Sequence, residues 1–147
     1  MKIGLKITLK DPANPANIIN AQFATVRGNP QLKDLLQKIA DLDVAENIAL
    51  KKLSLAAAEL DAAEDAAAVD ALSEKLKSLR HAADNATCAL LEATRAFIVA
   101  GFALAGASDE RAEDLTDAVG IENIQELKAK CLFGAGCLDF TQSPARN

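Results

Sequence analysis

Polar and apolar side chains alternate from residue 2 to residue 10. The apolar positions of this stretch are Ile3, Leu5, Ile7 and Leu9. A period of two is typical of a half-buried β-strand. Residues 11–15 contain two prolines and predict a turn, after which residues 18–26 have the pattern of a return strand. The chain up to residue 28 is therefore predicted to form a β-hairpin, which needs an apolar partner because an isolated hairpin is only marginally stable.

A helical period begins at Pro30, with Asn29 as a suitable N-cap. Apolar residues recur there at alternating steps of three and four, as in a helix that packs along another helix. This first seam consists of Leu32, Leu35, Ile39, Leu42, Ala49, Leu53, Ala56, Leu60 and Ala63. Only Glu46 interrupts it, and Asp43 with Glu46 has the spacing of a capping box. We therefore expect the helix to kink or restart at this point.

The same period resumes after the acidic residues Glu64 and Asp65 and continues without interruption. The second seam consists of Val69, Leu72, Leu76, Leu79, Ala83, Ala86, Leu90, Ala93, Phe97, Ala100 and Leu104. Two such helices predict an antiparallel coiled-coil hairpin over residues 30–105, with its bend near residues 64–68. A further apolar stripe consists of Cys88, Leu91, Ile98 and Phe102. We expect the two chain ends to cover this stripe, since the first helix begins where the second one ends.

Two short helices are predicted over residues 108–134. Ser108 is a suitable N-cap, and the acidic residues that follow it are favourable at a helix N-terminus. Gly120 ends the first helix, with Ile121 placed for a Schellman-type contact, and glycines at 134 and 136 end the second. Residues 141–147 are predicted to be a frayed tail. The expected fold is one mainly α domain spanning residues 1–147, with an N-terminal β-hairpin and a long helical hairpin.

The composition supports close-packed helices and argues against several functions. Half of the 147 residues are hydrophobic, but there are only five Phe and no Trp or Tyr. A net charge of -5 argues against a nucleic-acid partner. The N-terminus lacks the pattern of a signal peptide, and the longest apolar run, Ala96–Ala107, is too short to span a bilayer. Three cysteines without a CxxC spacing suit a reducing compartment. We therefore expect a cytoplasmic protein that does not enter a membrane.

The residues suited to catalysis or metal binding do not converge. Ser78, His81 and Asp84 have a triad composition, but they follow one another along the outer surface of one helix, which cannot surround a substrate carbonyl. A zinc site would need His81 together with all three cysteines. His81 and Cys88 are about 10 Å apart along a helix, so buried packing cysteines are the preferred interpretation. Gly101 and Gly106 have the spacing of P-loop glycines but lack the following lysine. We predict no enzyme, no cofactor and no metal.

Charged residues gather in three places, and solvated surface is the alternative interpretation for each. A basic band consists of Lys51, Lys52, Lys75, Lys77 and Arg80. An acidic tip, around the predicted bend, consists of Glu59, Asp61, Glu64, Asp65 and Asp70. Residues 109–126 form a second acidic region. The acidic tip is our candidate partner-binding site, because two acidic regions on one small protein would attract a basic partner.

Two segments resemble parts of a known family. The strand GLKITLK, followed by ANIINAQFATVRG, is similar to the hairpin that opens the tail assembly chaperones of long-tailed bacteriophages. The segment SDERAEDLTDAVGIENIQELKAKCLFGAG is similar to the short helices that close them. The long helical hairpin departs from that family. The resemblance implies a non-enzymatic protein that holds other virion proteins ready for assembly, in the host cytoplasm.

The sequence thus predicts a protein-protein interaction or assembly factor, with another protein as partner, basic in charge or part of a virion. Two alternatives stay open. One is an oligomeric structural or virion component built by coiled-coil packing between copies. The other is a small phage-type inhibitor of a host protein.

Overall fold

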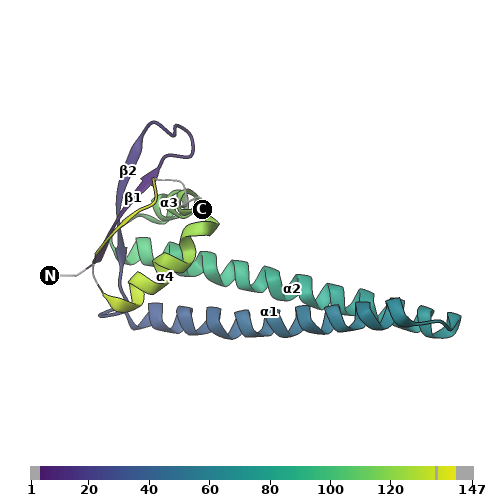
Figure 1. Ribbon diagram of the computed structural model, residues 1–147. Coiled ribbons are helices and arrows are strands. Elements are labelled where there is room, and N and C mark those ends of the chain that lie inside the picture. The colour runs from purple at the N-terminus through teal and green to yellow at the C-terminus, as the bar shows by residue number, and fades with distance from the viewer. Residues whose placement is uncertain (1–3, 135, 142–147) are drawn as a thin grey trace. The chain divides into compact units, whose positions relative to one another are not determined.

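The computed structural model describes residues 4–134 and 136–141, which are mainly helical. The elements in chain order are β1 (Gly4–Lys10), β2 (Ile18–Ala24), α1 (Pro30–Ala62), α2 (Ala66–Leu104), α3 (Asp109–Val119), the 3-10 helix η1 (Ile121–Asn123), α4 (Ile124–Phe133) and β3 (Gly136–Asp139) (Figure 1). The chain divides into two compact units. The terminal unit consists of Met1–Leu36 and Arg95–Asn147, and the middle unit is Gln37–Thr94. Both chain ends thus belong to one unit, as the sequence predicts.

The sheet of the terminal unit has three strands in the order β2-β1-β3. β1 and β2 form the predicted antiparallel hairpin, in which Leu5 pairs with Phe23 and Leu9 pairs with Ile19. β3 is not predicted by the sequence. It pairs in parallel with β1, with Leu138 beside Ile7, and the Phe140 N–H then donates to the Thr8 carbonyl over 2.8 Å.

The core of the terminal unit lies between the inner face of the sheet and the helices. Leu5, Ile7 and Leu9 are almost completely buried, so the predicted inward face of β1 is confirmed for these three residues. Ile3 lies outside the described residues. Phe23 packs edge to face against two rings of α2, with centroid distances of 5.6 Å to Phe97 and 5.1 Å to Phe102. These three aromatic side chains anchor the C-terminal end of α2 to β2.

The two predicted C-terminal helices are confirmed as α3 and α4. The hydroxyl oxygen of Ser108 accepts the Arg111 N–H over 3.2 Å, which is the expected N-cap of α3. Gly120 follows α3 with a positive φ of 79°. The expected Schellman contact of Ile121 is wrong, because this side chain is 74% exposed and begins η1 instead. The predicted tail at 141–147 lies outside the described residues except for Thr141.

The middle unit is a pair of long helices that run side by side (Figure 1). The predicted seam positions, such as Leu53 and Ala56 on α1 and Leu79 and Ala83 on α2, are half-buried or buried, whereas most positions between them are exposed. α1 runs without interruption through Glu46, which is half-buried, so the expected kink is wrong. One polar residue does not break a helix whose neighbouring turns all pack.

The connection between α1 and α2 is shorter and earlier than predicted. Residues 63–65 form it, and residues 66–68 already belong to α2. Alanine has the highest helix propensity, so Ala66–Ala68 join the helix. The carboxylate of Asp65 accepts the Ala67 N–H over 3.3 Å and supplies the N-terminal cap.

Among the described residues, α2 alone is long and apolar enough to cross a membrane, judged by length and composition. An 18-residue window of it has a mean hydropathy of 1.5, although no uninterrupted apolar run reaches that length. In the terminal unit the same helix buries Phe97, Ile98 and Phe102, and 33% of the apolar window is buried.

Candidate functional site

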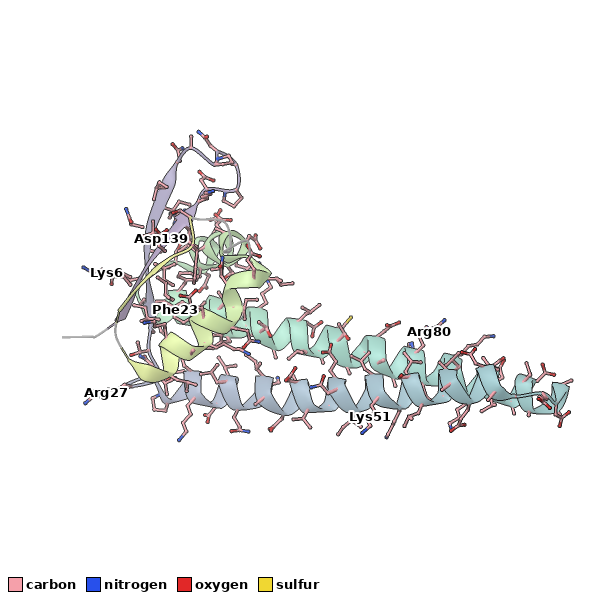
Figure 2. The ribbon with its side chains drawn as sticks, viewed as in Figure 1. Lys6, Phe23, Arg27, Lys51, Arg80 and Asp139 are labelled. Atoms are coloured by element: carbon pink, nitrogen blue, oxygen red, sulfur yellow. The ribbon has the colours of Figure 1, made fainter. Side chains whose placement is uncertain are left out.

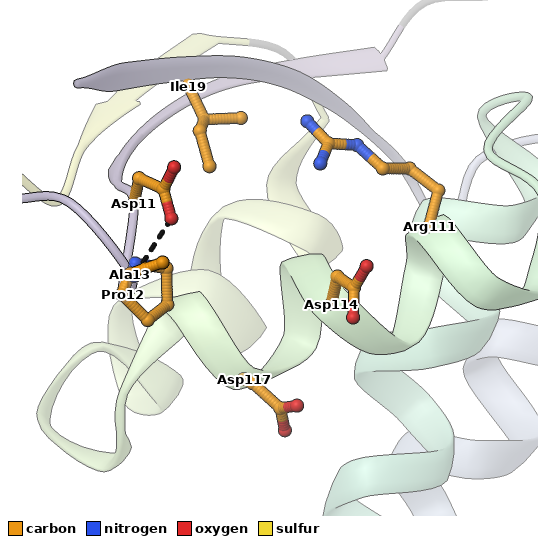
Figure 3. A pocket seen from close by; sticks show the side chains of 7 residues that line it. All are labelled: Asp11, Pro12, Ala13, Ile19, Arg111, Asp114 and Asp117. Carbon is orange, nitrogen blue, oxygen red and sulfur yellow. Dashed lines mark hydrogen bonds between the residues drawn. The ribbon is translucent and has the colours of Figure 1, made fainter.

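The terminal unit contains a surface hollow of about 360 Å³ beside α3. Its lining consists of Asp11, Pro12, Ala13, Ile19, Arg111, Asp114 and Asp117 (Figure 3). The first three residues belong to the β1–β2 loop, Ile19 comes from β2, and the last three come from α3. The sequence does not reveal this hollow, because the loop and α3 are about one hundred positions apart along the chain.

Three carboxylates and one guanidinium make the hollow acidic overall. The Asp11 carboxylate accepts the Ala13 N–H over 2.9 Å, which holds it in a local turn. The guanidinium of Arg111 extends from α3 toward Ile19 (Figure 3). The lining that the structure describes thus offers carboxylates and one guanidinium, with no nucleophile beside a general base.

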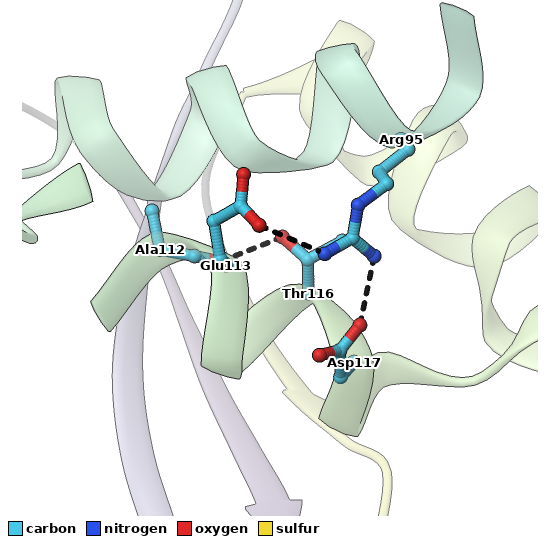
Figure 4. Close-up of polar contacts among 5 residues, drawn as sticks. All are labelled: Arg95, Ala112, Glu113, Thr116 and Asp117. Carbon is cyan, nitrogen blue, oxygen red and sulfur yellow. Dashed lines mark hydrogen bonds and ion pairs between the residues drawn. The ribbon is translucent and has the colours of Figure 1, made fainter. Parts of the chain in front are cut away.

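Arg95 joins α2 to α3 on the outside of the terminal unit. Its Nη1 donates to Asp117 Oδ1 over 2.7 Å, and its Nη2 donates to Glu113 Oε2 over 3.2 Å (Figure 4). Both hydrogen bonds raise the pKa of Arg95, and the bond to Asp117 has the larger effect. The Arg95 side chain is 44% exposed, so the contribution of the two pairs to stability is small. Asp117 thus accepts a hydrogen bond from Arg95 and also lines the hollow.

The acidic tip predicted from the sequence surrounds the connection between α1 and α2. All five carboxylate residues, Glu59, Asp61, Glu64, Asp65 and Asp70, are exposed. Glu59 lies 4.0 Å from the ammonium group of Lys75, and Asp65 caps α2. In the part of the chain that the structure describes, Asp61, Glu64 and Asp70 form no ion pair. The tip therefore carries uncompensated negative charge at the α1–α2 connection.

The basic band predicted from the sequence is not one continuous patch. Lys51 and Arg80 extend from opposite sides of the helix pair, Lys51 from α1 and Arg80 from α2 (Figure 2). Lys77 lies 3.5 Å from Glu74, and Lys75 faces Glu59. When two helices pack along a seam, their other residues point outward in different directions. Cations that lie at the same distance along the two helices therefore need not be neighbours.

The residues considered for catalysis or metal binding lie apart. Ser78, His81 and Asp84 are all exposed on α2. Of the three free cysteines only Cys131 is buried, so the expectation of buried packing cysteines is wrong for Cys88 and Cys137. Leu91 is also 52% exposed, so coverage of the second stripe begins only near Ile98. Within residues 4–134 and 136–141, no three His, Cys, Asp or Glu side chains gather as metal ligands.

Cys131 has a structural position in the terminal unit. Its thiol donates to the Ala24 carbonyl over 3.5 Å, and its own carbonyl accepts the Val26 N–H over 3.1 Å. Burial raises the pKa of this thiol to about 11, against a smaller lowering by a backbone hydrogen bond of Val26. The thiol is therefore protonated at neutral pH and poorly reactive.

An apolar stripe on the outside of α1 is the feature that the sequence interpretation missed. Val44, Ile48 and Leu55 are 57%, 50% and 57% exposed, and they follow one another at helical steps of four and seven. Their spacing is visible in the sequence, but the stronger seam on the other face conceals it. Exposed large apolar residues in one row are typical of a protein-binding surface.

Comparisons with known proteins place the chain in no group: no family model matches it, and no curated protein or solved structure matches it.

Proposed function

We propose that the protein is a non-enzymatic interaction or assembly factor that binds another protein through its middle unit. One observation carries this proposal. Of the eight large hydrophobic side chains that are exposed among the described residues, five lie in the middle unit: Val44, Ile48, Leu50, Leu55 and Leu91. A unit that serves only to support a buried site would not need so much exposed apolar surface.

We also propose that α1 and α2 pair as an antiparallel coiled coil. The support is the regular exclusion of water from the seam positions of both helices, at steps of three and four. Alanine at several seam positions lets two helices approach closely. Such a pair is stiff enough to present an outer surface and a charged end to a partner.

The partner proposed for the acidic tip is basic, because Asp61, Glu64 and Asp70 have no compensating cation among the described residues. Opposite charge accelerates encounter and supplies selectivity. The similarity of two segments to phage tail assembly chaperones supports a virion protein as this partner, met in the host cytoplasm.

The test uses the full chain as bait, with the tail proteins encoded by neighbouring genes, or a lysate of the infected host, as the source of partners. The variant D61K/E64K/D70K reverses the tip and spares both the capping residue Asp65 and the paired residue Glu59. We expect it to capture the partner at least about tenfold less well. Unchanged capture would refute the acidic tip as the binding site.

A matched control separates the tip from total charge. The variant D43K/D84K/E92K makes the same change of net charge at exposed positions of the middle unit that lie outside the tip. It should capture the partner as well as the unchanged protein does. Equal loss in both variants would mean that only the overall negative charge matters.

A further inference from the structure

We propose that the outer face of α1 binds a second copy of this chain, as an antiparallel dimer with two-fold symmetry. This inference goes beyond the proposed function: it assigns Val44, Ile48 and Leu55 to a second copy of the chain and leaves the acidic tip to the other protein. The face is a row of exposed residues turned away from the seam: Gln37, Asp41, Val44, Ile48, Lys51 and Leu55. No element of the described chain covers this row.

The order of charges along the row is complementary to itself. The central part of the row begins with the acidic residue Asp41 and ends with the basic residue Lys51. Val44 and Ile48 lie between them. The steps from one to the next are three, four and three residues, so they are the same in both directions. When a second copy lies antiparallel on this face, Val44 of each copy meets Ile48 of the other, and Asp41 of each copy meets Lys51 of the other.

The next residues on either side continue this arrangement. Gln37 and Leu55 each lie four residues beyond the charged pair, so Leu55 of one copy lies on Gln37 of the other. Gln37 Nε2 donates to Asp41 Oδ1 over 3.0 Å, which orients the carboxylate without neutralising it. Lys51 forms no ion pair within the described residues, and its side chain extends from α1 away from α2 (Figure 2). Both charges of the proposed contact are thus available.

A parallel arrangement would not use these charges. With the two copies in the same direction and register, Asp41 would face Asp41 and Lys51 would face Lys51, which is repulsive. The antiparallel arrangement turns both contacts into attraction, and symmetry forms each of them twice. The charges therefore select the direction of the second copy, and the apolar pair at the centre supplies the burial.

The size of the row sets the strength of the contact. From Gln37 to Leu55 it extends about 27 Å along the helix. One helix face of this length is smaller than a standard stable interface, so we expect a reversible dimer with a Kd between about 1 µM and 1 mM. The dimer would then form where the protein is concentrated and dissociate where it is dilute.

The experiment is sedimentation equilibrium of the purified full chain over a range of concentrations. The variants D41K and K51D should each weaken self-association at least about tenfold, because each places two pairs of like charges in contact. The exchanged variant D41K/K51D should restore it to within about threefold of the unchanged chain. A mixture of the D41K and K51D chains should also associate, since the mixed dimer contains only opposite charges in contact.

Three outcomes would overturn the proposal. The first is an unchanged chain that stays monomeric at millimolar concentration, which would leave the face for a protein of another sequence. The second is a D41K chain that associates normally. The third is a failure of both the exchanged variant and the mixture to associate. The control D84K makes the same charge change on α2 and should associate as the unchanged chain does, while circular dichroism verifies that every variant is folded.

Discussion

The ring of Phe23 lies so close to the backbone of Gly101 that a side chain on this glycine has no room. A Cβ atom placed on Gly101 would be 2.0 Å from Cζ of Phe23. The glycine is within α2, where alanine would ordinarily be the better residue. The glycine at this position therefore allows β2 to pack closely on α2.

The variant G101A should lower the free energy of unfolding by roughly 1–3 kcal/mol, because the new methyl group must displace the Phe23 ring. In a protein that already carries F23L, G101A should lower the free energy of unfolding much less or even raise it. The ring is then absent, and alanine still has a higher helix propensity than glycine. Chemical unfolding of the four proteins forms a double-mutant cycle that measures this coupling. Equal effects of G101A in both backgrounds would contradict the contact.

Alkaline pH should destabilise the protein through Cys131. The pKa of this thiol is about 11 in the folded protein, against an ordinary value of 9.0. The unfolded chain releases the proton first, so the contribution to stability is complete below pH 9 and falls as the pH rises from 9 to 11. The loss is at most about 2–3 kcal/mol, and it should be absent from C131A. Urea unfolding at pH 8, 9 and 10 measures the difference between the two proteins.

The same burial predicts how the thiols react. Cys88 and Cys137 are exposed and should react with a thiol reagent at neutral pH, whereas Cys131 should react only after the addition of denaturant. Mass spectrometry after brief labelling identifies the modified positions. Rapid labelling of Cys131 in the native protein would show that the terminal unit opens readily.

Replacing Arg95 by methionine should cost less than about 1 kcal/mol, because the side chain is 44% exposed although its guanidinium bonds two carboxylates. Salt screens such pairs, so the difference between R95M and the unchanged protein should diminish as the salt concentration rises. Arg80, which forms no ion pair among the described residues, supplies the control R80M. A cost of R95M that does not change with salt would indicate lost packing of the methylene groups instead.

Glu46 is the polar residue in the otherwise apolar seam of α1, and it is half-buried. The variant E46L should therefore stabilise the middle unit by about 1 kcal/mol, as burial of an added apolar group predicts. The exposed residue Glu92 provides the control E92L, which should leave the melting temperature nearly unchanged. Thermal unfolding followed by circular dichroism compares them, at a concentration low enough to avoid association.

The sequence predicts the elements that repeat over many residues. Alternation at Leu5, Ile7 and Leu9 identifies β1, and long runs at steps of three and four identify α1 and α2. Strand β3 has four residues, of which only Leu138 is buried, so its period is too short to recognise. Its position depends on pairing with β1, more than 120 residues away in the sequence.

The candidate sites show the same difference between features that are local in the sequence and features that need distant residues to meet. The acidic tip is local in sequence, and its residues do lie around the α1–α2 connection. The hollow beside α3 needs Asp11 and Asp114 to meet across the fold, which no local pattern reveals. The prediction of one basic band is wrong for a different reason. The sequence indicates how far along the helix pair a residue lies. The side of the pair on which Lys51 or Arg80 lies depends on the rotation of each helix about its own axis.

The parallel pairing of β3 with β1 has a consequence for the order in which the protein acquires its structure during synthesis. β1 leaves the ribosome early, but its second neighbour is translated only after the whole of Gln37–Thr94. The middle unit joins residues that are consecutive in the chain, so it is able to form first. Until residues 136–139 emerge, one edge of β1 is unpaired and available to other strands. We therefore expect the open edge of β1 to be the part of the sheet that is exposed to misassembly until β3 is translated, while α1 and α2 are already able to fold.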